Sequence, residues 1–194
     1  MSGSSTDTWQ NTEVVTPGPT KKTAISDVHH RRFTVVGVDP GLANLGIGAL
    51  AEEGRNEVHL LGSLLITTNA AEDQNSRLRK IRDQVHGFLE LHEPDALAIE
   101  GQFFHHQKAA AFKVGQAFGI VRLCAADLDI PVFEYGPLQV KQALVGNGRA
   151  DKAQVAYMVR ALLKLKSTPS VNHVSDALGL ALTHLQSRRI ASLR

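Results

Sequence analysis

The sequence predicts an α/β fold in which helices cover both faces of a mixed five-stranded sheet. Short apolar runs, the first of them rich in β-branched residues, are followed by longer segments of helical periodicity, and the first three runs are joined by short turns. A hairpin-connected start followed by alternating helices and strands is typical of such a sheet. With 194 residues and 43% hydrophobic content, the chain is long enough to build one domain with its own core.

Three strands are expected to open the domain. Residues 33–38 form a nearly continuous apolar run that ends at the turn signal Asp39-Pro40-Gly41. Two further apolar runs, over 45–51 and 58–67, flank a polar turn. Because these connections are short, we expect the three strands to form an antiparallel meander.

The rest of the chain alternates helices with strands. Apolar residues recur at helical spacing over 72–92, and Pro94 then precedes a buried strand over 95–100. The remaining elements are expected as a helix over 107–127, a strand over 132–135, and helices over 137–144, 151–165 and 174–187. Residues 1–32 are rich in Ser, Thr, Gly, Pro and mixed charges, so we expect a disordered tail ahead of one folded domain over 33–194.

Acidic side chains end two of the predicted strands. Asp39 follows the first strand and Glu100 ends the fourth, where an unpaired carboxylate repels its neighbours unless a cation joins them. Near the C-terminus, His173 and Asp176 are three residues apart, so they share one face of the first turn of the last helix. Carboxylate oxygens suit Mg²⁺ or Mn²⁺, and Mn²⁺ accepts an imidazole. The four residues form a candidate metal site.

Each of these residues also has a simpler interpretation. An Asp after a strand is usually a turn former, and a Glu there is often part of a surface ion pair. His173 could cap the helix or lie in the core, and Asp176 could favour the helix N-terminus electrostatically. The metal-site interpretation therefore depends on the joint placement of all four.

Positive charge is concentrated toward the C-terminus. Residues 137–194 carry 9 Lys and Arg against 2 Asp and Glu, whereas residues 33–136 carry 8 against 14. Since a phosphate backbone requires cations, the charge asymmetry predicts a nucleic-acid footprint flanking the acidic site. For about half of the basic residues, the alternative is a solvated helix surface. The candidates are Lys141, Arg149, Lys152, Arg160, Lys164, Lys166, Arg188 and Arg189.

Two further features lie in predicted loops. Asp151 can cap the helix that follows it, and Lys152 would then lie in the first turn of that helix, where backbone N–H groups favour phosphate. The simpler interpretation of the glycine-rich stretch 146–148 is a flexible turn. Phe103 and Phe104 follow the strand that ends at Glu100. They are either core residues or exposed rings on which unpaired bases stack.

Cysteine content and hydropathy indicate the compartment. Cys124 is the only cysteine, which excludes a disulfide framework and fits a reducing compartment. The chain has no apolar run long enough to span a membrane, and residues 1–32 lack the apolar core of a secretory signal and carry acidic residues that count against a transit peptide. We therefore expect a cytoplasmic protein with no membrane partner.

Five motifs follow one another between about residue 33 and about residue 187: Val38-Asp39-Pro40-Gly41, Ala98-Ile99-Glu100, Val132-Phe133-Glu134-Tyr135, Gln139-Val140-Lys141-Gln142, and the string from His173 through Asp176-Ala177-Leu178 to Ala181-Leu182-Thr183-His184. In content and order, these motifs resemble the RuvC family of bacterial Holliday-junction resolvases. The resemblance implies a ribonuclease H-like fold. It also implies a homodimeric endonuclease that resolves four-way DNA junctions by paired symmetric nicks in recombination and repair.

The resemblance assigns roles to particular residues. The family's catalytic metal ligands fall on Asp39, Glu100, His173 and Asp176, holding Mg²⁺ or Mn²⁺, two ions per subunit. The expected DNA contacts are Phe103, Phe104, Lys141, Arg149 and Lys152. The helix over 107–127 would supply the subunit interface, and the RuvA–RuvB branch-migration complex is a further expected partner. The best-studied members have Asp where this chain has His173, which leaves open the preferred metal and whether His173 is a ligand or a general base.

Three other functions share parts of this pattern. A ribonuclease H-like RNA hydrolase would use the same carboxylates without needing a dimer or the paired phenylalanines. An ATPase of the actin-like superfamily also begins with a strand and a D-x-G turn, as Asp39-Pro40-Gly41 does, but this chain is short for two such lobes. A non-catalytic junction-binding module would bind DNA without divalent-dependent nicking.

Overall fold

The structure, a computed structural model, describes residues 32–54, 57–101, 108–166 and 172–192. The strands are β1 (Phe33–Asp39), β2 (Asn44–Glu53), β3 (Glu57–Thr67), β4 (Ala96–Glu100) and β5 (Val132–Tyr135). The helices are α1 (Gln74–His92), α2 (Lys108–Asp127), α3 (Pro137–Val145), α4 (Lys152–Leu162) and α5 (Asn172–Ser192). Their order is the one expected from the sequence. Except for Arg32, the predicted disordered tail lies outside the described residues.

The five strands form one mixed sheet in the order β3-β2-β1-β4-β5. The expected meander is confirmed, because β1 pairs with β2, and β2 with β3, in antiparallel orientation. β4 adds to the other side of β1 in parallel, and β5 adds in parallel to β4. The carboxyl ends of the two central strands, β1 and β4, therefore meet at one edge of the sheet.

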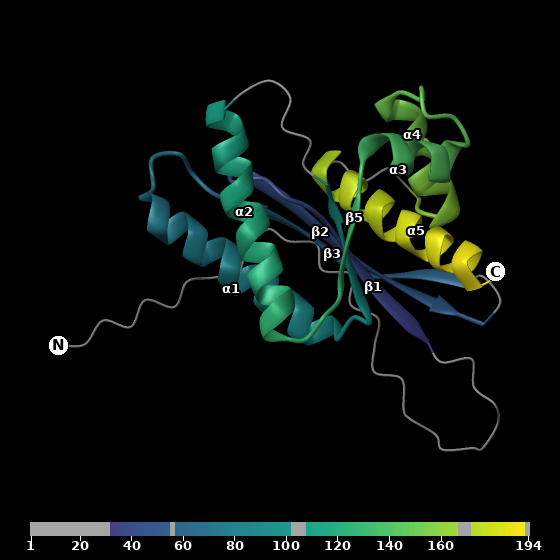
Figure 1. The fold of residues 1–194 in the computed structure, drawn as a ribbon, viewed down its shortest axis with the longest axis horizontal. Helices are drawn as coiled ribbons and strands as arrows, with labels where there is room; N and C mark the ends of the chain where they lie inside the picture. The colour runs from purple at the N-terminus through teal and green to yellow at the C-terminus, as the bar shows by residue number, and fades with distance from the viewer. Residues whose placement is uncertain (1–31, 55–56, 102–107, 167–171, 193–194) are drawn as a thin grey trace, which may run out of the picture.

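Helices cover both faces of the sheet, as predicted, and Figure 1 shows α1 and α2 on one side and α3, α4 and α5 on the other. The alternation of side chains along β1 explains this arrangement. Val36 and Val38 join a core cluster with α1 and α2, whereas Val35 joins a second cluster with the other three helices. Each face of the sheet thus has its own buried layer.

α5 is the central helix of the second layer. Its residues from Val174 to Leu185 are buried around nearly the whole circumference, because the sheet lies on one side while α3 and α4 contact the other. The helix was expected to end near residue 187 but continues to Ser192, and Arg188 and Arg189 in this extension form ion pairs with Glu52. None of the helices in the described ranges combines the length and apolarity required to cross a bilayer.

The ends of α1 and α4 follow local sequence signals. The Asp73 side chain accepts a hydrogen bond from the Ser76 N–H at the start of α1, and Glu93 closes that helix in the left-handed conformation just before Pro94. The predicted cap at Asp151 is confirmed, since its carboxylate accepts from the Gln154 N–H at 2.8 Å. α4 ends at Leu162, three residues earlier than expected.

Candidate active site

The four residues predicted as metal ligands come together in one cleft. Asp39 and Glu100 reach it from the ends of β1 and β4, and His173 and Asp176 reach it from the first turns of α5. The cleft has a volume of about 250 Å³. Its complete lining is Asp39, Glu100, Pro137, Val140, Lys141, Lys152, Val155, His173, Asp176 and Leu180. The joint placement on which the sequence interpretation depended is therefore present.

The sheet brings the two strand-end carboxylates together. Val38 of β1 is in register with Ile99 of parallel β4, so Asp39 and Glu100 are the next residues along adjacent strands. Both strands are buried up to that point, and the Asp39 side chain is only 13% exposed. The strand pairing thus holds two carboxylates in a poorly solvated place, which is costly unless a cation or hydrogen-bond donor is near.

Two glycines allow α5 to carry its side chains to the same place. A Cβ atom on Gly37 of β1 would overlap the Ala177 carbonyl oxygen, and one on Gly46 of β2 would overlap the His173 carbonyl oxygen. The helix backbone therefore rests directly on the strand backbones, as glycine in a strand permits. The two glycines are visible in the sequence, and glycine inside a strand is a signal of such a close backbone approach.

His173 and Asp39 form the closest contact in the cleft. The His173 Nδ1 lies 2.6 Å from Asp39 Oδ2. An ionised carboxylate only accepts hydrogen bonds, so Nδ1 is the donor and Nε2 remains for another partner. The contact bridges residues 134 apart in the sequence and ties the start of α5 to the end of β1.

Lys152 and Lys141, which the sequence predicts as DNA contacts, line the cleft from α4 and α3. Lys152 Nζ lies 3.4 Å from Asp176 Oδ2, and its side chain is 82% exposed. An exposed ion pair of this kind contributes at most about 1 kcal/mol. Lys152 is therefore free to exchange Asp176 for a phosphate at little cost.

The electrostatics of the cleft favour the binding of positive charge. Burial raises the pKa of Asp39, with the hydrogen bond from His173 opposing the shift and the charge of Asp176 adding to it. Burial also raises the pKa of Glu100, and the charges of Asp39 and Asp176 raise it further. Like-charged carboxylates that raise one another's pKa gain stability when a cation enters between them.

Three carboxylates and one imidazole are a donor set that fits hard divalent cations. In the described part of the chain, however, no three Asp, Glu, His or Cys side chains are arranged as a ready metal-binding group. The contacts explain this arrangement, because Asp39 is turned toward His173 and Asp176 toward Lys152. Ion binding would require side-chain rotations that turn these carboxylates toward one another.

The other predicted basic residues are not all near the cleft. Arg149 is exposed in the loop before α4 but does not line the cleft. The expectation that Arg188 and Arg189 flank the metal site is wrong, because both pair with Glu52. They also follow His173 by 15 residues or more on α5, which places them roughly 22 Å along the helix axis. A charge count along the sequence does not distinguish the two ends of one helix.

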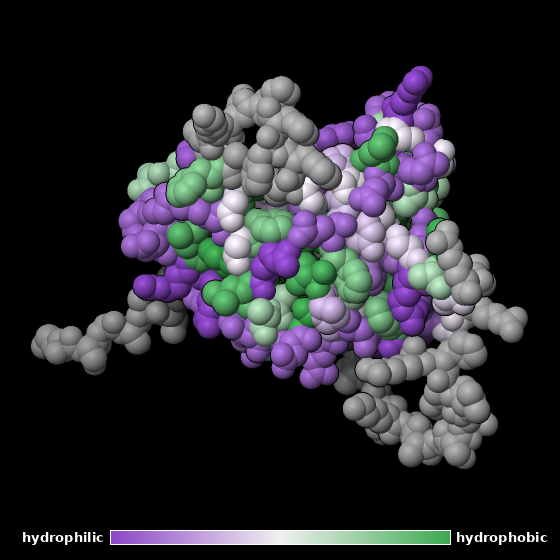
Figure 2. All heavy atoms as spheres, in the orientation of Figure 1, coloured by the Kyte–Doolittle hydropathy of each residue, from purple (hydrophilic) through white to green (hydrophobic). Residues whose placement is uncertain are grey.

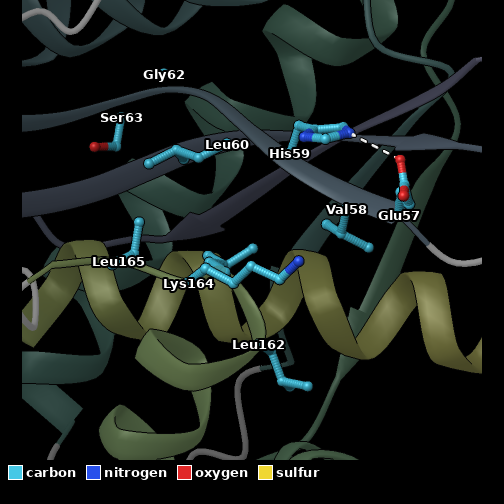
Figure 3. Close-up of a pocket in the computed structure, with 10 residues that line it drawn as sticks. Glu57, Val58, His59, Leu60, Gly62, Ser63, Leu162, Lys164 and Leu165 are labelled. Atoms are coloured by element: carbon cyan, nitrogen blue, oxygen red, sulfur yellow. Dashed lines mark ion pairs between the residues drawn. The ribbon is translucent and has the colours of Figure 1, made fainter.

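A second hollow lies along the outer strand of the sheet, and Figure 3 shows it between β3 and residues 162–165. Its volume is about 590 Å³, larger than that of the carboxylate cleft. It contains an ion pair of His59 with Glu57 at 3.9 Å and the side chain of Lys164, which was predicted as part of the DNA footprint. None of the predicted ligand residues lines it, so size does not identify the active site.

The apolar wall of the cleft was not predicted from the sequence. Val140, Val155 and Leu180 line the cleft, but their spacing only marks them as helix residues facing a core. Phe103 and Phe104, predicted to contact DNA, lie outside the described residues.

A sheet of order β3-β2-β1-β4-β5, with a carboxylate cleft at the shared end of its two central strands, defines an enzyme of the ribonuclease H-like class. The family model described as "Crossover junction endodeoxyribonuclease RuvC" matches residues 35–184. The chain belongs to this RuvC family.

Individual relatives agree with the family assignment. The RuvC of Thermus thermophilus is 42% identical over 164 residues, which cover 84% of this chain and 99% of the relative. The RuvC of Brevibacillus brevis is 40% identical over 159 residues, covering 82% and 95%. The structure described as "T. thermophilus RuvC in complex with Holliday junction substrate" matches with a TM-score of 0.79 and 42% identity, over 82% of this chain and 97% of that one.

Proposed function

We propose that this protein is a structure-selective endonuclease that resolves four-way DNA junctions by paired symmetric nicks in recombination and repair. One observation carries the proposal: Asp39, Glu100, His173 and Asp176 reach a single cleft from three distant segments of a RuvC-family chain. The Thermus thermophilus relative with a Holliday junction supports the same substrate class.

The nucleases of this family depend on divalent metal ions, and we assign the ligands here to Asp39, Glu100, Asp176 and His173. Two ions per subunit, Mg²⁺ or Mn²⁺, match the number and type of these donors. When bound, such ions lower the pKa of the attacking water and stabilise the departing 3′ oxygen.

The chain's own side chains position the substrate around that chemistry. Lys141 and Lys152 at the cleft would neutralise the phosphates on either side of the scissile bond. Asp39 holds Nδ1 of His173, so Nε2 is the nitrogen left either to ligate an ion or to accept a proton from the attacking water. One nitrogen cannot do both at once. The products would carry 5′-phosphate and 3′-hydroxyl ends.

We also propose that the active protein is a C₂ homodimer, because two symmetry-related cuts require two copies of one site. The exposed surface of α2 supports this proposal. Phe112 and Leu123 are 67% and 57% exposed, and Cβ atoms on Gly115 and Gly119 would meet no neighbouring atom. Figure 2 shows apolar side chains gathered over α2. The open glycine face of α2 favours packing against a second subunit.

The subunit interface can be tested by adding charge to it. A Phe112→Glu variant should sediment as a monomer, keep the far-UV circular dichroism of the wild type, and lose paired nicking. Glu substituted for the exposed Leu91 of α1, which is 74% exposed, serves as the control and should remain dimeric. A Phe112→Glu protein that is still a dimer would place the interface elsewhere.

Phe103 and Phe104 follow Glu100 by three and four residues in the sequence. We propose that Phe103 stacks on a base at the junction crossover, which contributes about 1–3 kcal/mol per base. A Phe103→Ala variant should unstack fewer bases, as measured with fluorescent base analogues in the junction. Unchanged fluorescence would remove Phe103 from this role.

We propose the cytoplasm as the compartment of this protein. We also propose the RuvA–RuvB branch-migration complex as a further partner, on the strength of family membership.

The decisive experiment compares a synthetic four-way junction with a linear duplex of matched sequence. With Mg²⁺ or Mn²⁺, the protein should introduce nicks at positions related by the junction's two-fold axis and leave the duplex intact. Nicking that needs no divalent ion, or that is equal on both substrates, would reject the proposal. An RNA–DNA hybrid tests the alternative RNA hydrolase, and tight binding without nicking would indicate the non-catalytic module.

A further inference from the structure

We propose that Arg77 is a positioning residue for the active site, acting through Thr68 on the turn that follows Asp39. This inference rests on the proposed function only in taking Asp39 as a metal ligand. Asp39 is the last residue of β1, and residues 40–43 then carry the chain back into β2. Any movement of this turn is passed to Asp39.

The turn is held from two directions. Leu42 is 4% exposed and lies in the core cluster that includes Val38. From the side, the Thr68 backbone N–H donates to the Ala43 carbonyl at 3.0 Å, and the Thr68 hydroxyl donates to the Leu42 carbonyl at 2.6 Å. Thr68 therefore bonds both residues in the second half of the turn.

Arg77 supports Thr68 from α1. Its Nε donates to the Thr68 hydroxyl oxygen at 2.9 Å, and its Nη2 lies 3.5 Å from the Leu42 carbonyl oxygen. The directions agree, because a hydroxyl has a single proton, which Thr68 gives to Leu42, and so Thr68 can only accept from Arg77. The result is a continuous chain of hydrogen bonds from α1 to the turn beside Asp39.

The burial of Arg77 argues for a specific role. The residue is 8% exposed, yet it takes part in none of the ion pairs found among the described residues. A buried guanidinium with only neutral acceptors is costly, and an apolar side chain would fill the same place at lower cost. What an apolar side chain cannot supply is a rigid planar fork that reaches two oxygens at once.

Residues that orient metal ligands without touching the metal typically change metal affinity or activity about 10- to 100-fold when they are replaced. We therefore expect Arg77 and Thr68 to affect ion binding and cutting, but not the affinity for DNA. This separation distinguishes a positioning role from general structural support.

The test uses Thr68→Val, which removes the hydroxyl but keeps the shape of the side chain. Its matched control is Thr67→Val at the neighbouring exposed position. Calorimetric titration with Mn²⁺ in the absence of DNA should show affinity lowered about 10-fold in Thr68→Val and unchanged in Thr67→Val. Single-turnover junction cleavage should slow by about 10- to 100-fold, with junction affinity in EDTA unchanged. Thr68→Ser should restore both Mn²⁺ binding and cutting.

Arg77→Met should reproduce the Thr68→Val pattern, and Arg79→Met, at an exposed position of the same helix, should not. Wild-type Mn²⁺ affinity in a folded Thr68→Val protein would overturn the inference. So would a loss of affinity that Thr68→Ser fails to restore. If the wild type does not cut junctions, the proposed function fails, whereas the Mn²⁺ titration still decides the role of Thr68 and Arg77.

Discussion

At the scale of single residues, Asp39 links the fold to the chemistry. It ends the central strand, its side chain is 13% exposed, and it accepts a hydrogen bond from His173. Asn has the same shape but lacks the charge, so Asp39→Asn should leave the fold and junction affinity intact while lowering the cleavage rate by about 1,000-fold or more. Gel-shift titration in EDTA and cleavage assays in Mn²⁺ measure the two effects.

The control for this variant is Asp83→Asn, an exposed change on α1 that should leave both binding and cutting unchanged. If Asp39→Asn cut junctions at a rate close to that of the wild type, Asp39 would not be a metal ligand.

Glu100 gives a prediction about stability and pH. Burial, and then the charges of Asp39 and Asp176, raise its pKa. The folded protein thus binds this proton more tightly than the unfolded chain. The resulting stability is fully present below the ordinary pKa of Glu and is lost as the pH rises through the raised value. At neutral pH in EDTA, Glu100→Gln should therefore melt a few degrees above the wild type.

The difference in Tm between Glu100→Gln and the wild type should disappear near pH 4, where the wild-type carboxyl is protonated. Added Mn²⁺ should reverse the order, because an ion stabilises the protein that binds it more tightly. Scanning calorimetry across pH measures each of these effects. A variant that melts below the wild type in EDTA at neutral pH would contradict the assigned direction.

At the scale of elements, the contact of α5 with the sheet sets the geometry of the site. Because a Cβ on Gly46 would overlap the His173 carbonyl oxygen, Gly46→Ala must move the first turn of α5. Overpacking in a core typically costs about 1–3 kcal/mol, and a backbone overlap belongs at the upper end of that range. We expect urea denaturation to show that the free energy of unfolding falls by about 3 kcal/mol. The cleavage rate should fall at least in proportion, because the first turn of α5 carries His173 and Asp176.

Gly87→Ala on α1 is the matched control, since a Cβ there meets no neighbouring atom. That variant should gain roughly 0.5–1 kcal/mol from helix propensity and cut junctions normally. A Gly46→Ala protein as stable as the wild type would show that α5 can move away from β2 without a loss in the free energy of unfolding.

The elements themselves were predictable because local signals agree with tertiary packing. Pro94 and the turn at 39–41 mark element ends that the structure confirms, and β5 has its predicted bounds. The wrongly predicted element ends are those that the local sequence pattern does not determine. α4 ends early just before Lys164, which takes a left-handed conformation, and α5 runs on because Glu52, 136 residues from Arg188, pairs with its last turns.

At the scale of the whole molecule, the cleft was predictable because strand ends and a helix start are the places where a sheet gathers distant residues. Parallel pairing of β1 with β4 makes Asp39 and Glu100 neighbours, which follows from their position after buried strands. The side-chain partners were not predictable. Nothing in the sequence shows that Lys152 pairs with Asp176, because rotamers depend on packing in three dimensions.

The same limit applies to the charge asymmetry, and it leads to a prediction about DNA binding. Lys141 lines the cleft, whereas Arg188 pairs with Glu52 and stacks on Phe33 at 4.0 Å. Each phosphate contact adds about 0.9 to the slope of log affinity against log salt concentration. Lys141→Ala should therefore reduce the slope by about 1, whereas Arg188→Ala should leave it unchanged and lower stability by about 1 kcal/mol. Junction titrations at several salt concentrations measure the slopes. Equal changes in slope for the two variants would mean that DNA reaches the far end of α5 and that the footprint extends well beyond the cleft.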